Sequence, residues 1–179
     1  MITVFSGSNR RNSKTSIFAK YFHELLSKSS KEEVHFFSLE DLPLDICHAE
    51  MYSPKGQSKA LAAIQDKYLI PVEKFLFVFP EYNGSFPGAL KLMIDACSIR
   101  EYKPTFKGKK AGLVGTASGR AGNLRGMDHL TGVLHHVGTQ VMPNKLPISS
   151  IEQLLDGDQL VDEGAIKTMT QYVEQFLAF

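Results

Sequence analysis

A continuous apolar strand that leads through a polar loop directly into a helix constrains the fold of this chain most. Phe75–Phe79 holds five consecutive apolar residues without alternation, which is typical of a strand covered on both faces inside a parallel sheet. Pro80 ends this predicted strand, and Pro87 suits the first turn of the helix that follows. Ligands of open α/β sheets bind beyond the carboxyl ends of the strands, so the loop Pro80–Phe86 is a candidate site.

Strand and helix patterns alternate along the whole chain without a linker or repeat, which indicates βαβ units in a single domain, residues 1–179. The predicted strands are Ile2–Phe5, Val34–Phe37, Phe75–Phe79, Ala111–Gly115 and Gln140–Met142. The predicted helices are Ser13–Lys28, Gln57–Ile70, Pro87–Arg100, Asn123–Val137 and Val161–Phe179. This pattern matches a three-layer α/β fold of the flavodoxin-like type, a five-stranded parallel sheet of order 2-1-3-4-5 with helices on both faces.

A second candidate loop, Ser6–Thr15, joins the first predicted strand to the first predicted helix. It is rich in hydroxyl and basic residues and ends at a helix N-terminus, where unpaired N–H groups and the helix dipole favour an anion. Arg10, together with Arg11, can contact phosphate oxygens. The other predicted donors in this loop are Ser8, Ser13, Lys14 and Thr15. A simpler alternative is that Ser13 only caps the helix and that the arginines are solvated.

The spacing of glycines in this first loop matches neither a nucleoside triphosphate P-loop nor a dinucleotide-binding turn, so the predicted ligand group is a mononucleotide phosphate. In the second loop, Asn83-Gly84 favours a tight turn that leaves main-chain N–H groups pointing outward. Tyr82 adds a flat apolar face with a polar tip, which suits a planar heteroaromatic ligand, although ordinary loop packing is an alternative.

Charge and composition favour a small-molecule partner. Twenty Lys and Arg against 19 Asp and Glu give a net charge of +1, which argues against nucleic acid and against an anionic membrane surface. No apolar run approaches the roughly 18 residues of a membrane span, and the first residues lack a secretory signal, so a cytoplasmic location is predicted. The two cysteines are expected to be reduced, and no metal site is predicted because ligand clusters are missing.

Three further segments have structural interpretations. His129, His135 and His136 lie on one predicted helix and are assigned to surface or partner-helix packing rather than to a metal. Lys107–Lys110 is expected to be a solvated lead-in to the fourth strand. The apolar residues Leu90, Leu92, Met93 and Ile94 surround their helix on all sides, which predicts an interface with a second copy of the chain.

The two loops together resemble the NADPH-dependent FMN reductase family of flavodoxin-like proteins, which includes azoreductase-like and quinone- or chromate-reducing members. The resemblance rests on Gly7-Ser-Asn-Arg10 with Ser13 and Thr15, and on Pro80-Glu-Tyr-Asn83 with Pro87. A third segment, Ala117–Asn123, follows the fourth strand where the family has a Gly-rich loop. At Gly122-Asn123 this chain departs from the family's Gly-Gly, which is expected to alter the mouth of the pocket.

The resemblance implies an NAD(P)H-dependent flavoprotein oxidoreductase that passes electrons through FMN to a quinone, an azo compound, a metal oxyanion or free flavin. It also implies a homodimer, with a tetramer as the alternative. The implied residues at the phosphate are Ser8, Arg10, Ser13, Lys14 and Thr15, and those at the flavin ring are Pro80, Glu81, Tyr82, Asn83, Gly84, Ser118 and Gly119. No catalytic side chain is expected, because the flavin carries the chemistry.

Main-chain N–H groups of the turn Pro80–Gly84 are predicted to contact the ring, with Arg120 at its outer rim.

Two other functions remain open from the sequence. One is a flavodoxin-like electron carrier without its own small-molecule substrate, against which the balanced charge argues. The other is a regulatory domain that keeps the fold without a cofactor.

Overall fold

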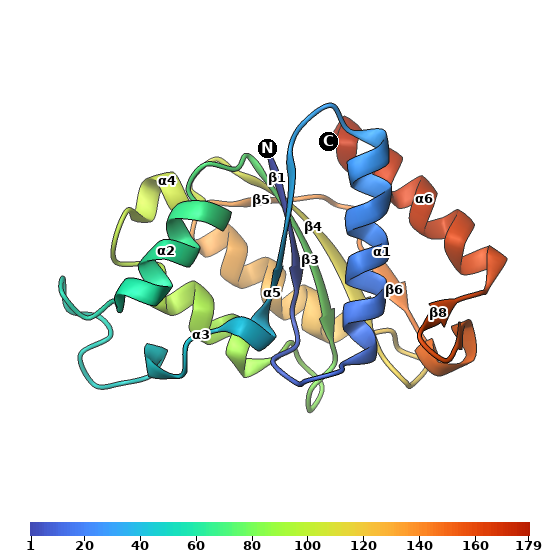
Figure 1. The fold of residues 1–179 in the computed structure, drawn as a ribbon, viewed down its shortest axis with the longest axis horizontal. Coiled ribbons are helices and arrows are strands. Elements are labelled where there is room, and N and C mark those ends of the chain that lie inside the picture. Colours follow the sequence, from blue (N-terminus) through green and yellow to red (C-terminus); the bar gives the residue numbers. More distant parts are fainter.

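The apolar segments of the sequence form a parallel sheet at the centre of the molecule, in a computed structural model that describes residues 1–179 (Figure 1). The long strands are β1 (Ile2–Ser6), β2 (Val34–Ser38), β3 (Lys74–Pro80) and β4 (Lys110–Thr116). The order across the sheet is β2-β1-β3-β4-β5, with every adjacent pair parallel. The predicted three-layer fold and strand order are therefore confirmed.

The fifth predicted strand, Gln140–Met142, corresponds to the short strand β5 (Gln140–Val141), and a further short strand, β6 (Leu146–Ile148), also pairs with β4. Met142 still donates its N–H to the carbonyl of Ala111. The chain then leaves the sheet at Pro143, which has no N–H to donate to a ladder. The prediction of a single strand Gln140–Met142 thus missed β6 after the proline.

Helices cover both faces of the sheet. α1 (Lys14–Ser29) and α6 (Glu163–Ala178) cover one face, while α2 (Lys59–Tyr68), α3 (Gly88–Ala96) and α5 (Leu124–His136) cover the other (Figure 1). Short elements that the sequence did not predict complete the chain. They are α4 (Tyr102–Phe106), the 3-10 helices η1 (Leu39–Asp41), η2 (Leu44–Ile46) and η3 (Ile151–Leu154), and the hairpin strands β7 (Leu155–Asp156) and β8 (Gln159–Leu160).

The position of β3 at the centre of the sheet explains why Phe75–Phe79 is uniformly apolar in the sequence. Phe75, Phe77 and Phe79 belong to the core under α2, α3 and α5, whereas Leu76 and Val78 belong to the core under α1 and α6. All five side chains are at most 1% exposed. Alternate side chains of a strand point to opposite faces, so a strand buried on both faces shows no polar alternation.

The third predicted helix is shorter than expected, because α3 ends at Ala96 rather than at Arg100. Gln65 of α2 is fully buried, and its Nε2 donates to the carbonyls of Cys97 and Arg100 at 3.0 and 2.7 Å. These bonds satisfy carbonyls that no longer have a helical partner. A long-range side-chain contact therefore stabilises the end of the helix.

The prediction that four apolar residues of α3 face a partner is wrong for three of them. Leu90, Met93 and Ile94 are at most 1% exposed within the chain's own core. Leu92 is partly exposed and packs at the edge of that core. The helix is apolar on most sides because the sheet, α2 and α5 all contact the same core.

The prediction of a solvated Lys107–Lys110 is wrong at Lys109, which is only 8% exposed. Its Nζ donates to the carbonyls of Leu69, Ile70 and Val72 where the chain passes from α2 to β3. Burial lowers the pKa of Lys109 to about 8. The lysine thus satisfies three main-chain carbonyls in the segment that follows the end of α2.

No helix in the molecule combines the length and the apolar run needed to cross a bilayer.

Candidate functional site

The carboxyl ends of β1, β3 and β4 meet around a cavity of about 290 Å³. Both predicted loops contribute to its wall, together with the segment that follows β4 and with η3. Its lining residues are Arg10, Asn12, Ser13, Lys14, Thr15, Pro80, Glu81, Tyr82, Thr116, Ala117, Ser118, Ile151 and Glu152. Parallel strands that end at the same edge bring these loops together, as is general for ligand sites in open α/β sheets.

The first loop supplies the cations and donors of the cavity. Arg10 and Lys14 both line it, whereas Arg11 is exposed outside the lining, so the predicted sharing between two arginines is not seen. The N–H groups of Lys14 and Thr15 have no acceptor within the protein. Helix α1 has no acidic residue in its first turn to compete for an anion. Cations, a helix N-terminus and free N–H groups are the features that bind phosphate.

Ser13 distinguishes the two interpretations of this loop. It occupies the N-cap position of α1, but its side chain accepts no capping hydrogen bond. Instead its main-chain carbonyl accepts a hydrogen bond from Ser16 Oγ at 2.7 Å. The Ser13 hydroxyl remains available in the wall of the cavity, so the alternative that Ser13 merely caps the helix is not what the structure shows.

A direct contact joins the first loop to the second. Ser8 Oγ lies 2.8 Å from the hydroxyl of Tyr82 and also accepts the N–H of Arg10 at 3.2 Å. Ser8 is 1% exposed and is not part of the cavity lining. Its hydroxyl therefore holds Tyr82 and Arg10 in position.

The second loop contains the expected tight turn. Asn83 and Gly84 both have positive φ, 52° and 78°, and Tyr82 and Ser85 exchange two main-chain hydrogen bonds across them. Two consecutive positive φ angles define the turn that Asn-Gly favours in two-residue hairpins. The N–H groups of Asn83 and Gly84 have no acceptor within the protein, whereas Glu81 and Tyr82 already donate theirs to main-chain carbonyls. Asn83 and Gly84 lie outside the cavity lining and would extend it.

The third segment, which follows β4, contains residues that line the cavity and residues that lie outside its lining. Ser118 lines the cavity, Gly119 is exposed next to it, and Arg120 is exposed beyond both. Thr116, which the sequence analysis missed, is buried with its hydroxyl 2.9 Å from that of Thr15. A buried polar residue at the end of a central strand was the available signal for it.

Asn123 does not lie at the mouth of the pocket, so the expectation drawn from Gly122-Asn123 is wrong. The residue is fully buried, and its Nδ2 donates to the carbonyl of Phe79 at 3.1 Å. This bond ties the start of α5 to the end of β3, directly before the second loop. Asn123 has a φ of 65°, a left-handed conformation that Asn tolerates better than most residues.

Glu152 is another residue of the cavity wall that the sequence analysis missed. It follows β6 on η3, and its Oε1 lies 2.9 Å from Lys14 Nζ in the wall of the cavity. The two residues are 138 positions apart. No local sequence pattern joins an exposed glutamate to a loop so distant in the chain.

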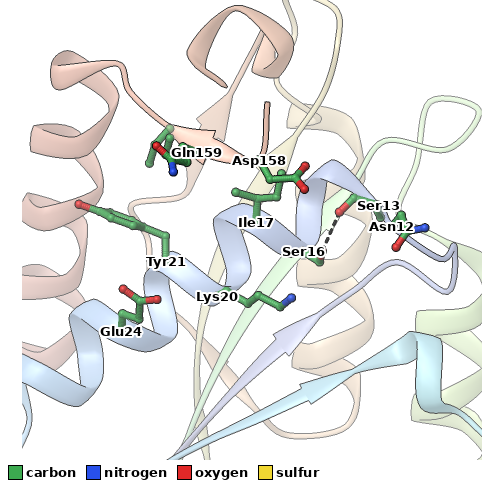
Figure 2. Close-up of a pocket in the computed structure, with 10 residues that line it drawn as sticks. Asn12, Ser13, Ser16, Ile17, Lys20, Tyr21, Glu24, Asp158 and Gln159 are labelled. Atoms are coloured by element: carbon green, nitrogen blue, oxygen red, sulfur yellow. Dashed lines mark hydrogen bonds between the residues drawn. The ribbon is translucent and has the colours of Figure 1, made fainter. Parts of the chain in front are cut away.

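Two other cavities differ in chemistry from the first. A cavity of about 550 Å³ lies between α1 and the hairpin of β7 and β8, where Lys20, Tyr21 and Glu24 lie across from Asp158 and Gln159 (Figure 2). It shares Asn12 and Ser13 with the first cavity but has one lysine against two carboxylates. It therefore suits a phosphate less well than the cavity with Arg10 and Lys14.

A third cavity, of about 650 Å³, lies between α3 and α5. His129 and His136 both line it, whereas His135 does not, as their spacing predicted. His129 Nδ1 lies 2.9 Å from Ser85 Oγ, next to the second loop. No group of three or more His, Cys, Asp or Glu side chains in the molecule is arranged to hold a metal ion.

Comparison with known proteins gives consistent results. The family model described as NADPH-dependent FMN reductase matches residues 1–153. The 2-hydroxy-1,4-benzoquinone reductase of a Burkholderia species is 28% identical over 181 residues, covering 99% of this chain and 94% of that protein. The NADPH azoreductase of a Bacillus species is 24% identical over 159 residues, covering 88% of this chain and 80% of that protein.

Among solved structures, the flavoenzyme NAD(P)H:(acceptor) oxidoreductase FerB from Paracoccus denitrificans has a TM-score of 0.79 at 26% identity, covering 99% of this chain and 94% of that chain. An FMN-dependent NADH-azoreductase from Bacillus anthracis, solved in complex with FMN, shares the fold with a TM-score of 0.62 at 16% identity, covering 97% and 96%. The family model spans most of the chain. The chain therefore belongs to the NADPH-dependent FMN reductase family, which confirms the predicted family, oxidoreductase activity and FMN cofactor.

Proposed function

We propose that the cavity at the ends of β1, β3 and β4 holds FMN and that the enzyme reduces quinones and azo compounds with NAD(P)H. The proposal rests on one observation. The loop that contains Arg10 and Lys14 and the loop that contains Tyr82 line the same cavity, and a hydrogen bond between Ser8 and Tyr82 links them. The names of the benzoquinone reductase and azoreductase relatives support these two acceptor classes. Metal oxyanions and free flavin are further candidate acceptors that follow from the family.

In this proposal Arg10, Lys14 and the hydroxyls of Ser13 and Thr15 bind the phosphate of FMN. Pro80, Glu81 and Tyr82 of one loop and Ser118 and Gly119 of the other are the residues that would hold the ring. When bound, FMN supplies the redox chemistry, because it accepts a hydride from nicotinamide and passes electrons to the acceptor. The free N–H groups of Asn83 and Gly84 would be available to donate hydrogen bonds to polar atoms of the ring.

The experiment records the visible spectrum of the purified protein with added FMN and then adds NADPH under anaerobic conditions. Flavin bands that bleach with NADPH and return on addition of a quinone support the proposal. Bound FMN that NADPH does not reduce would instead favour an electron carrier, and absence of FMN binding would overturn the proposal. The assay is repeated with NADH to compare the two donors.

Two arginines of the first loop provide a matched pair of variants. Arg10→Ala removes a guanidinium that lines the cavity, whereas Arg11→Ala removes one that is exposed outside it. Loss of a charge-assisted phosphate contact is expected to weaken FMN binding about 10-fold to 100-fold in the first variant only. Equal losses in both variants would show that general charge, and not this cavity, attracts the phosphate.

We also propose that the chain works in the cytoplasm as a homodimer that pairs through the surface between α3 and α5. Apolar Val133, Val137 and Tyr102 line the cavity there, and Tyr102 is 36% exposed. The same surface adjoins the second loop through the contact of His129 with Ser85. Sedimentation velocity at micromolar protein concentration tests the proposed dimer. A monomeric species would contradict the dimer, and a tetrameric species would require a second interface.

A further inference from the structure

An acidic side chain lies beside the cations of the phosphate loop. Glu152 Oε1 and Lys14 Nζ are 2.9 Å apart, and both residues line the 290 Å³ cavity. The side chains are 63% and 48% exposed, so solvent screens this ion pair and it contributes little to folding stability. Such an exposed ion pair at a binding site affects ligand affinity more than it affects folding stability, because a charged ligand can compete for either partner.

Main-chain hydrogen bonds of the two residues before Glu152 position it at the cavity. The N–H of Ser150 donates to the carbonyl of Gly119, and the N–H of Ile151 donates to that of Ala117. Ile151 itself is buried in the core under α1 and α6. The segment before Glu152 is therefore hydrogen-bonded to the loop after β4, which places the backbone of Glu152 at the wall of the cavity, within reach of Lys14.

The charges of the cavity are balanced. Its wall contains two cations, Arg10 and Lys14, and two carboxylates, Glu81 and Glu152. Glu81 follows β3 on the side of the aromatic loop, whereas Glu152 contacts the cation next to the helix N-terminus. A phosphate monoester carries about 1.5 to 2 negative charges at pH 7. Such a group has to compete with Glu152 for Lys14 and is also repelled by the carboxylate itself.

We propose that Glu152 is a specificity-determining residue that weakens the binding of the phosphate end of FMN, so that the flavin exchanges rather than staying permanently bound. This inference rests on the proposed function, because it assumes that the phosphate of FMN binds beside Lys14. It assigns to Glu152 an effect on flavins that carry a phosphate and none on riboflavin, which lacks it. A readily exchanged FMN is also consistent with free flavin as an electron acceptor.

The test measures the dissociation constants of FMN and riboflavin by quenching of flavin fluorescence in the wild type and in Glu152→Gln. The amide removes the charge with little change in shape, so the FMN dissociation constant is expected to fall about three- to tenfold. The riboflavin constant is expected to stay the same. Glu40→Gln is the matched control, because Glu40 is also an exposed glutamate in the first turn of a 3-10 helix.

The outcomes separate this inference from the proposed function. If the wild type binds FMN but Glu152→Gln changes the FMN and riboflavin constants equally, or changes neither, the role of Glu152 is overturned while the flavin site stands. If the wild type binds neither flavin, the proposed function itself fails. The same measurement in a Lys14→Met background shows whether Glu152 acts through Lys14, since the effect of Glu152→Gln should then shrink.

Discussion

The hydroxyl groups of Ser8 and Tyr82 lie 2.8 Å apart, although the two residues are 74 positions apart in the chain. Ser8 follows β1 and Tyr82 follows β3, and these two strands are adjacent in the sheet. The hydrogen bond therefore links the loop proposed for the phosphate to the loop proposed for the ring. A cofactor that spans both loops depends on their relative position.

Tyr82→Phe tests this link. The variant keeps the aromatic face and loses one hydrogen bond, so FMN affinity is expected to fall about three- to tenfold, since such a bond contributes roughly 0.5 to 1.5 kcal/mol. Ser8→Ala should have a similar effect, and the double variant should lose no more than either single one. Fluorescence titration measures the affinities. Tyr52→Phe is the control, because Tyr52 is 57% exposed and lies outside the lining of the cavity.

The turn at Asn83-Gly84 gives a prediction about backbone strain. A Cβ at Gly84 would contact nothing within 4 Å, so only its φ of 78° opposes a side chain. Gly84→Ala is expected to lower the free energy of unfolding by about 1 kcal/mol. The control is Gly88→Ala, where the space is equally open and φ is not positive. Equal midpoints of chemical denaturation for the two variants would contradict a strained turn.

Lys109 gives a prediction about pH. Burial lowers its pKa in the folded protein from 10.5 to about 8, so between these values the unfolded chain binds more protons than the folded one. The free energy of unfolding contributed by this residue therefore rises as the pH increases from about 8 towards 10.5, and it does not change below that range. Lys109→Met should remove this contribution, measured by urea denaturation at several pH values as a difference in free energy of unfolding between wild type and variant that grows from pH 8 towards pH 10.5.

The same substitution has a second expected effect. Removing the ammonium leaves the carbonyls of Leu69, Ile70 and Val72 without their donor, which costs about 1 to 3 kcal/mol at neutral pH. Lys107→Met is the matched control, because Lys107 is exposed. The interpretation fails if both variants show the same dependence on pH.

Gln65 gives a prediction about stability without a change in binding. Gln65→Leu leaves the carbonyls of Cys97 and Arg100 unsatisfied, and the free energy of unfolding is expected to fall by about 2 to 4 kcal/mol. FMN affinity should not change, since Gln65 does not line the cavity. The exposed Gln171 provides the control variant Gln171→Leu. A large loss of FMN binding in a folded Gln65→Leu protein would refute this separation.

Sequence patterns predicted the parts of this protein that depend on local order and on burial. Phe75–Phe79 revealed a central strand, because burial on both faces leaves no polar position, and Asn83-Gly84 revealed its turn, because few residues adopt positive φ twice in succession. The residue types of the first loop, which lead into the N-terminus of α1, are the basis of the phosphate site that is proposed there.

Only the tertiary structure decided which of these residues meet and what surrounds them. The pairing of Glu152 with Lys14 and the burial of Lys109 against three carbonyls depend on segments that are distant in the chain. The end of α3 at Ala96 depends likewise on Gln65, which belongs to another helix. Such contacts leave no periodic signal in the sequence, since each involves a single polar side chain whose partner is brought near by the packing of helices on the sheet.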